Sequence, residues 1–163
     1  ACFLKFNKKR SISLETSFSN QYDAGGKDAL VDGLRGPNNY LTGRWQGFYG
    51  EDFESIVDLG SKEPVTYLNI GAIQHVRSWI WLPKKVEFLA SNDGKIFKSI
   101  GTLMHSVSDN SSESIIKQFE LKLKTSVEAR YIKVRAENYG KCPEWHLGSG
   151  GTSWLFFDEI TIL

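Results

Sequence analysis

An alternation of apolar and polar side chains with a period of two residues is the feature that most constrains the fold of this chain. Between residues 114 and 124, Phe119, Leu121 and Leu123 alternate with glutamine, glutamate and lysine side chains. Such alternation predicts a strand with one buried and one solvated face, which is typical of antiparallel sheets. No stretch of the sequence carries a long amphipathic helical repeat.

Further segments have strand character and are bounded by turn residues. A hairpin is predicted from strands at 86–90 and 95–97, because Asp93-Gly94 between them supplies the backbone angles of a tight turn. Many short strands separated by Gly, Pro and Asn favour an all-β sandwich or barrel. The polar stretch 106–113 is predicted to be an exposed loop. The other candidate strands are 12–16, 55–59, 65–73, 129–136 and 154–163.

The length of 163 residues suits one domain with a substantial core, so we expect residues 1–163 to form a single domain. The formal net charge is +1 and Lys and Arg are dispersed, which argues against a nucleic-acid partner. No apolar run reaches the roughly 20 residues that span a bilayer, and residues 1–10 lack the order of a signal peptide. We therefore expect an excised module. Cys2 and Cys142 either pair or remain free thiols.

Carboxylates occur in a turn-rich segment near the start and again in the last predicted strand. Asp32 precedes Gly33, Thr42 adds a hydroxyl a few residues on, and Asp158 and Glu159 lie near the end. Ca²⁺ accepts roughly 6 to 8 oxygen ligands, so one loop and one distant acid can fill most of its shell if a closed sandwich brings them together. The alternative is a solvated turn and an unrelated surface glutamate, since the spacing lacks the fixed calcium-loop pattern.

Large aromatic side chains occupy segments that lie at or beside the predicted strand ends. These segments are 45–49, 75–81 and 143–146. A tryptophan face can pack on the C–H side of a sugar, while neighbouring His, Arg, Gln and Glu side chains bond its hydroxyls. This combination indicates a carbohydrate site on loops of a rigid scaffold. The alternative is that the rings fill the ends of the sandwich.

The two interpretations apply to different tryptophans. We expect Trp45 and Trp154 to pack in the core, because one precedes a predicted strand and the other lies inside the last one. Trp79 and Trp145 are the stronger candidates for binding, since polar residues and glycines flank them.

Signatures of catalysis are missing from the sequence. It contains no G-x-S-x-G, H-E-x-x-H or phosphate-cradling G-x-x-x-x-G-K pattern. Two carboxylates such as Glu144 and Asp52 can hydrolyse a glycosidic bond without a local signature, at a separation of ~5 to 9.5 Å. We nevertheless expect a protein that is not an enzyme, because most acids fall in turns or on solvated strand faces.

Five segments taken together resemble the coagulation factor 5/8 type C, or discoidin, family. Within that family the chain is most similar to carbohydrate-binding modules of family 32, especially those at the carboxyl end of bacterial β-N-acetylhexosaminidases. The resemblance covers nearly the whole chain and implies a jelly-roll, galactose-binding-like antiparallel β-sandwich with a structural Ca²⁺. The segments are Tyr22–Gly33, Val57–Gly60, Phe88–Gly94, Ala129–Val134 and Phe157–Ile160.

The resemblance also implies which residues hold the ion and which meet a sugar. In the family, sugar sites lie on loops at one end of the sandwich and combine an aromatic platform with His, Arg and Asn. Here Gln46 follows Trp45 where many members have His, and Gln74 stands roughly at the place of the usual Arg. The implied metal ligands are side-chain oxygens of Asp32 and Glu159, a hydroxyl or carbonyl of Thr42, and carbonyls of Ala29, Leu34 and Asp158. The candidate sugar-binding residues are Gln46, His75, Arg77, Trp79, Trp145 and His146.

We therefore predict a noncatalytic carbohydrate-binding module that is extracellular, on the cell surface or periplasmic in a bacterium. It would target an attached glycoside hydrolase to glycans that end in galactose or N-acetylhexosamine. One alternative is a structural domain that docks on a parent catalytic domain and binds no sugar. Phospholipid binding through Trp79 and Trp81 beside Lys84 and Lys85 is disfavoured by the net charge near zero.

Overall fold

The computed structural model describes residues 10–163, which form strands joined by turns, loops and short 3-10 helices. No helix within this range is long and apolar enough to cross a membrane. The helices are η1 (Asn20–Tyr22), η2 (Ala29–Val31), η3 (Tyr40–Thr42) and η4 (Val76–Ser78). The strands are β1 (Ser11–Leu14), β2 (Gln46–Tyr49), β3 (Phe53–Gln74), β4 (Val86–Ser91), β5 (Lys98–Leu103), β6 (Ile115–Ala136) and β7 (Trp154–Ile162).

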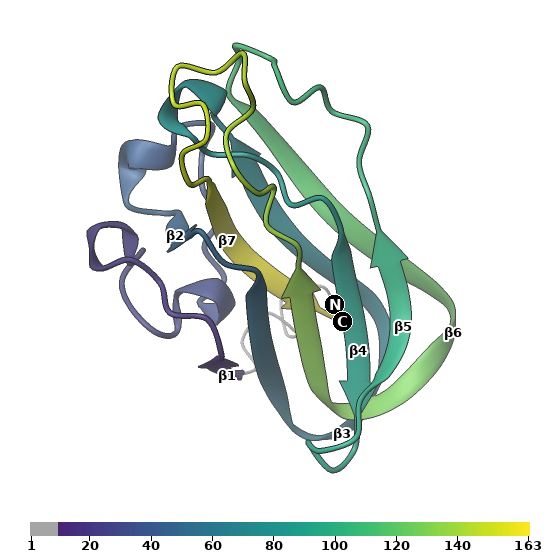
Figure 1. Cartoon of the computed structure of the whole chain (residues 1–163). Coiled ribbons are helices and arrows are strands. Elements are labelled where there is room, and N and C mark those ends of the chain that lie inside the picture. The colour runs from purple at the N-terminus through teal and green to yellow at the C-terminus, as the bar shows by residue number, and fades with distance from the viewer. Residues whose placement is uncertain (1–9) are drawn as a thin grey trace.

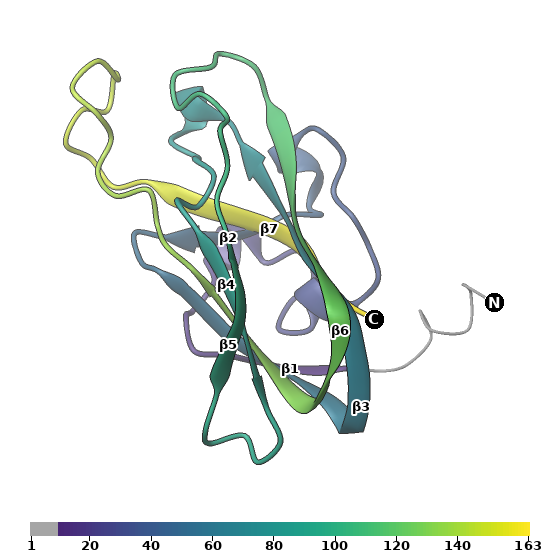
Figure 2. The same cartoon turned by 90° about the vertical axis from the view of Figure 1, so that its right-hand side faces the viewer.

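The strands build two antiparallel layers, and the long strands β3 and β6 run through both of them (Figures 1 and 2). Residues 53–65 of β3 pair with residues 127–136 of β6. These parts, together with β1, β4 and β5, give the strand order β1-β3-β6-β4-β5, which we call the β4 layer. Residues 67–74 of β3 pair with residues 115–122 of β6. These parts, together with β2 and β7, give the strand order β2-β7-β3-β6, which we call the β7 layer. The predicted all-β jelly-roll sandwich is therefore confirmed.

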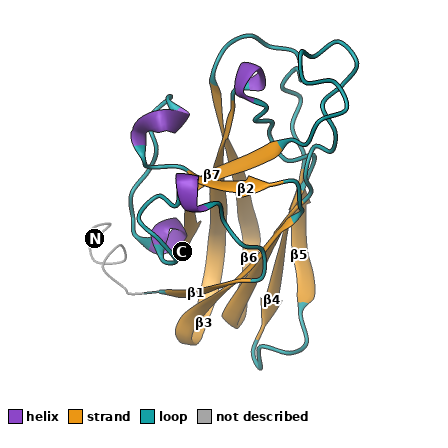
Figure 3. Ribbon diagram, turned by 60° about the vertical axis from the view of Figure 1, so that its left-hand side comes forward, coloured by secondary structure: helices purple, strands orange, loops and turns teal. Residues whose placement is uncertain are grey.

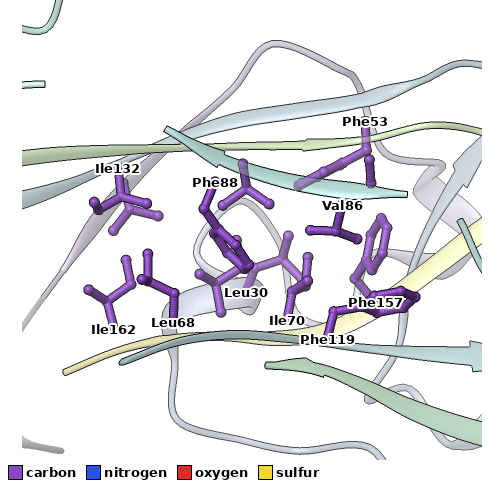
Figure 4. Close-up of a cluster of buried hydrophobic side chains, with 14 of the residues drawn as sticks. Leu30, Phe53, Leu68, Ile70, Val86, Phe88, Phe119, Ile132, Phe157 and Ile162 are labelled. Carbon is purple, nitrogen blue, oxygen red and sulfur yellow. The ribbon is translucent and has the colours of Figure 1, made fainter. Parts of the chain in front are cut away.

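The core lies between the two layers (Figure 4). Phe88 and Ile132 come from the β4 layer, and Ile70 and Phe157 come from the β7 layer. Leu30 of η2 is also fully buried in this core, so the segment that carries Asp32 is anchored to the sandwich. Burial of one such large apolar side chain stabilises the fold by roughly 1.5–3 kcal/mol.

Two pairs of predicted strands are single strands in the structure. Segments 55–59 and 65–73 are parts of β3, and segment 114–124, apart from its first residue, and segment 129–136 are parts of β6. Register shifts between Asp58 and Glu63 and between Val65 and Tyr67 mark the region where β3 and β6 pass from one layer to the other. Bulges of this kind bend a strand without ending it, so the break in alternation signals a bend rather than a loop.

The predicted hairpin forms, but its second strand starts at Lys98 and not at residue 95. The carboxylate of Asp93 accepts hydrogen bonds from the backbone N–H groups of Ile96 and Lys95, which hold these residues in the turn. These bonds lower the pKa of Asp93 to about 2. The second strand therefore starts three residues later than predicted, because the Asp93 side chain extends the turn.

Three connections gather at one end of the sandwich, opposite the β4–β5 hairpin (Figures 1 and 3). They are the β3–β4 connection with η4, the β5–β6 connection at 104–114 and the β6–β7 connection at 137–153. The predicted exposed loop 106–113 belongs to the second of them. The aromatic segments 75–81 and 143–146 lie in the first and the third of these connections.

Candidate functional site

A bulge in β7 places two carboxylates outside the core. Leu155 and Phe157 belong to the core cluster, and the next core residues of the strand are Ile160 and Ile162. Ile70 of β3 pairs with Ile160, and Ala72 pairs with Phe157. Two residues of β3 thus lie opposite three residues of β7, which is a register shift. Because an extra residue reverses the alternation, Asp158 and Glu159 both leave the core face.

Asp158 is fully buried on the outer side of the β7 layer, close to the backbone of β3. Its Oδ2 accepts a hydrogen bond from the backbone N–H of Gly36 at 3.0 Å, and its Oδ1 accepts one from Glu159 N–H at 2.7 Å. A Cβ atom at Gly71 would collide with Oδ1, so this position requires glycine. Burial raises the pKa of Asp158, although Gly36 and the nearby Arg35 oppose that effect.

Glu159 lies against Asp32, which confirms that the early loop and the last strand meet. The backbone N–H of Gly33 and the side chain of Asp32 hydrogen-bond to the Glu159 carboxyl group. Its Oε2 is buried and has no hydrogen-bond partner within residues 10–163. Burial first, and then the neighbouring Asp32 and Asp158, raise the pKa of Glu159 to about 9. A buried oxygen without a partner beside a second carboxylate suits a bound cation.

The other implied metal ligands have mixed placements. Ala29 is buried in η2, which packs against β7, and Leu34 donates its backbone N–H to Asp32 Oδ1 at 2.8 Å. Thr42 is exposed in η3 and its hydroxyl donates to the carbonyl of Asn39 at 3.1 Å. Within the described residues, no three His, Cys, Asp or Glu side chains converge as a metal site. A cation at Asp32 and Glu159 would thus draw most of its ligands from main-chain carbonyls.

Trp81 packs beneath the three connections at the end of the sandwich. Its ring is buried and stacks on Tyr139, with centroids 4.8 Å apart and an interplanar angle of 11°. The indole Nε1–H donates to the Asp109 carbonyl at 2.8 Å, and the Tyr139 hydroxyl donates to the Asp109 carboxylate at 2.7 Å. Burial and this hydrogen bond raise the pKa of Tyr139 to about 12. The three connections are therefore tied together beneath the surface.

His146 completes this tie and supports the exposed tryptophans. Its Nε2 donates to the carbonyl of Val76 at 2.7 Å, and its Nδ1 accepts from the backbone N–H of Gly148 at 2.9 Å. These roles place one proton on the ring, at Nε2, and leave it neutral. The ring packs edge-to-face against Trp79, Trp81 and Trp145. His146 is thus buried as a positioning residue rather than offered to a ligand.

Trp79 and Trp145 are the most exposed tryptophans, with exposed fractions of 38% and 53%, whereas Trp154 is partly buried. Trp79 has φ +65°, a left-handed conformation that is costly for a bulky residue and is often found at functional sites. Its indole covers Gly148, where a Cβ atom would lie 2.6 Å from Trp79 Cε2. The preference for Trp79 and Trp145 over Trp81 agrees with these exposures.

A groove of about 530 Å³ opens beside Trp145. Arg77 reaches it from η4, and the described residues give its guanidinium no hydrogen bond or ion pair. The groove offers an apolar ring, a cation and small polar side chains, which is a combination suited to a polar ligand with one apolar face. Its lining residues are Val76, Arg77, Asn110, Ser111, Ser112, Trp145, His146 and Leu147.

Three candidate sugar-binding residues, Gln46, His75 and Trp79, do not line this groove. Gln46 is fully buried in β2, and its Nε2 donates to the carbonyls of Asp23 and Gly26, both at 2.9 Å. The structure therefore gives Gln46 a role in holding a turn, which corrects its assignment to the sugar site. His75 is part of a hydrogen-bonded chain through Ser78 to the Tyr40 hydroxyl, beside the groove but not lining it.

Sequence reasoning missed the residues that the 104–114 and 137–153 connections contribute. Asn110 to Ser112 were predicted only as part of the exposed loop 106–113, and Leu147 was not among the candidate binding residues. The available signal for Leu147 was its place between Trp145-His146 and the glycine-rich segment 148–151. The acids Asp52 and Glu144 do not form a catalytic pair, since Asp52 accepts from Asn138 N–H in a separate groove that Glu144 does not line.

Comparison with known proteins adds a family and a set of related folds. The model of the F5/8 type C domain matches residues 13–155. A comparison with curated protein sequences finds no significant match. Among solved structures, a family 32 module from a family 31 glycoside hydrolase of Clostridium perfringens is 11% identical. Its TM-score is 0.59, and the match covers 95% of this chain and 94% of that one.

Two further similar structures are a module in complex with a sugar and a lectin. A family 32 module of Clostridium perfringens in complex with galactose is 15% identical with a TM-score of 0.57, covering 94% of this chain and 92% of that chain. A fucolectin from striped bass (Morone saxatilis) serum is 18% identical with a TM-score of 0.60, covering 96% of this chain and 46% of that chain. At these identities the likeness establishes a shared fold.

Proposed function

Because the chain belongs to the F5/8 type C domain family, we propose that it is a noncatalytic carbohydrate-binding module. Its site is the groove beside Trp145, and its ligands are terminal sugars of the galactose or N-acetylhexosamine type. The module would bring an attached glycoside hydrolase to such glycans outside the cell, at the cell surface or in the periplasm. A single shallow site binds weakly, and tethering to an enzyme raises the effective concentration.

The observation that carries this proposal is the exposed face of Trp145 next to unpaired polar groups. Trp145 is half exposed next to the fully exposed Leu147, and an apolar patch rimmed by polar residues is typical of an interaction site. His146 holds Trp145 in place from below, so the platform is preorganised. Arg77 and Asn110 lie along the same groove, where they can bond sugar hydroxyls.

Replacing Trp145 by Ala is expected to reduce glycan affinity by about 10- to 100-fold, because one buried aromatic contact is worth roughly 1.5–3 kcal/mol. Calorimetric titration with glycans chosen from an array would measure the loss. The matched control is Tyr49→Ala, which removes an aromatic ring of similar exposure, 52%, from β2. Equal affinity of wild type and Trp145→Ala for every glycan that binds would refute the site.

We also propose a structural Ca²⁺ at the Asp32–Glu159 pair, with no role in chemistry. When bound, the ion would pair with the buried carboxylate of Glu159 and the exposed carboxylate of Asp32, and would fix the 29–36 loop against β7. The unpartnered Glu159 Oε2 supports this assignment. Main-chain carbonyls of Ala29, Leu34 and Asp158 are the proposed further ligands, and Thr42 is a weaker one because its hydroxyl already donates to Asn39.

A docking domain that binds no sugar is the second candidate function. The observation that favours it is Leu147, which is fully exposed at the tip of the 137–153 connection next to Trp145. An apolar pair of this kind also suits a protein partner. Titration with free glycans separates the two functions, because a surface that only docks on a parent domain gives no signal with sugars.

A further inference from the structure

The groove beside Trp145 carries one sign of charge. Arg77 is the charged residue among those that line it, and none of the lining residues is an acid. Asp109, in the connection next to the groove, already accepts the Tyr139 hydroxyl. Glu144 precedes Trp145 in the chain but does not line the groove. Within residues 10–163 nothing in the groove neutralises the guanidinium.

The other polar groups of the groove are neutral. His146 donates through Nε2 and accepts through Nδ1, so its ring brings no charge. Asn110 Oδ1 accepts from the hydroxyl of Ser108 at 2.7 Å, which leaves its amide N–H groups to face a ligand. A ligand in this groove therefore meets an aromatic face, neutral donors and a single cation.

From this arrangement we propose that the module selects sugars that carry an anionic substituent, either a carboxylate or a sulfate ester. The proposal rests on the proposed function and narrows its ligand class. The apolar face of the sugar ring lies on Trp145, and the anion pairs with the planar guanidinium of Arg77. Two parallel N–H···O bonds make arginine well matched to such oxyanions.

The magnitude of the preference follows from the exposure of Arg77. A solvent-exposed ion pair contributes roughly 0.2–1 kcal/mol, and a hydrogen bond to a charged group that is shielded from water contributes about 1.5–3 kcal/mol. Stacking on Trp145 shields one side of the pair. We therefore expect the anionic sugar to bind about 5- to 10-fold more tightly than its neutral counterpart, and less so at high salt.

Galacturonate and galactose form the test pair, because they differ only in a carboxylate or a hydroxymethyl group at C6. Calorimetric or NMR titration of the wild type should give tighter binding of galacturonate, by about 5- to 10-fold. In Arg77→Gln both sugars lose a contact, but galacturonate loses the ion pair as well, so the ratio of the two affinities should fall to about 1. Lys95→Gln, which removes a cation from the hairpin turn at the opposite end, is the control and should keep the preference.

The outcomes distinguish this inference from the function on which it rests. Equal affinities for galacturonate and galactose, or a preference that persists in Arg77→Gln, overturn the anionic ligand class but leave the sugar site standing. Binding of no neutral or anionic glycan, on an array as well as in titration, overturns both. Galactose 6-sulfate serves as a third ligand: stronger binding than galacturonate assigns the site to sulfate esters, and weaker binding assigns it to uronates.

Discussion

Calcium is expected to raise the melting temperature of this domain by about 5–10 °C at a concentration 100 times its dissociation constant. Ligand binding at that ratio stabilises the folded state by about 2.7 kcal/mol. For a domain of this size each kcal/mol corresponds to roughly 2–4 °C. The physical source is the buried Glu159 carboxyl group beside Asp32, one oxygen of which has no partner within residues 10–163 and would bind the ion.

Differential scanning fluorimetry in EDTA and in CaCl₂ would measure this shift. Glu159→Gln should lose the response to calcium, because one of the two carboxylates is gone, while its melting temperature in EDTA does not fall. Glu128→Gln, which changes an exposed glutamate of β6, is the matched control and should respond like the wild type. A wild-type melting temperature that calcium leaves unchanged contradicts the proposed ion site.

Replacing Trp81 by Ala is expected to cost about 3–5 kcal/mol of unfolding free energy and also to weaken glycan binding. The indole fills the space between the three connections, stacks on Tyr139 and supports His146. Without it the ring of His146 loses its support, and Trp145 is no longer held in one orientation. Chemical denaturation and glycan titration would measure the two effects on the same variant.

Milder variants keep this prediction testable if Trp81→Ala does not fold. Trp81→Phe keeps a ring but removes the hydrogen bond to Asp109, and Tyr139→Phe removes only a hydroxyl. Each is expected to cost about 1 kcal/mol, with a smaller loss of affinity. Wild-type sugar affinity in a folded Trp81→Ala protein would show that the buried tie does not position the binding surface.

Much of the fold was predictable because its strands repeat the period of a pleated sheet. The alternation around Phe119 and the turn at Asp93-Gly94 located β6 and the β4–β5 hairpin. The sequence does not reveal that β3 and β6 continue through a bend, since Gly60 and the polar residues after it read as a turn. Pairing with neighbouring strands keeps such a bend extended, and pairing is a tertiary property.

The sites were predictable in residue type but less so in role. Asp32 and Glu159 meet as the resemblance implied, whereas the bulge that turns Asp158 and Glu159 out of the core leaves no mark in composition. Gln46 and His146 look like ligand contacts because they are polar neighbours of tryptophan. Both are buried and bonded to the backbone, and only coordinates reveal such partners.

The place of β7 in the sheet has a consequence for biosynthesis. Trp154 at its start bonds to the Trp79 carbonyl, Glu159 near its end meets Asp32, and the strand between them lies between β2 and β3. A nascent polypeptide that has not yet delivered residues 154–162 leaves β2 without a neighbour and exposes an edge of β3. Folding of this unit should therefore complete only after its final segment leaves the ribosome, and chaperone demand should be greatest just before that moment.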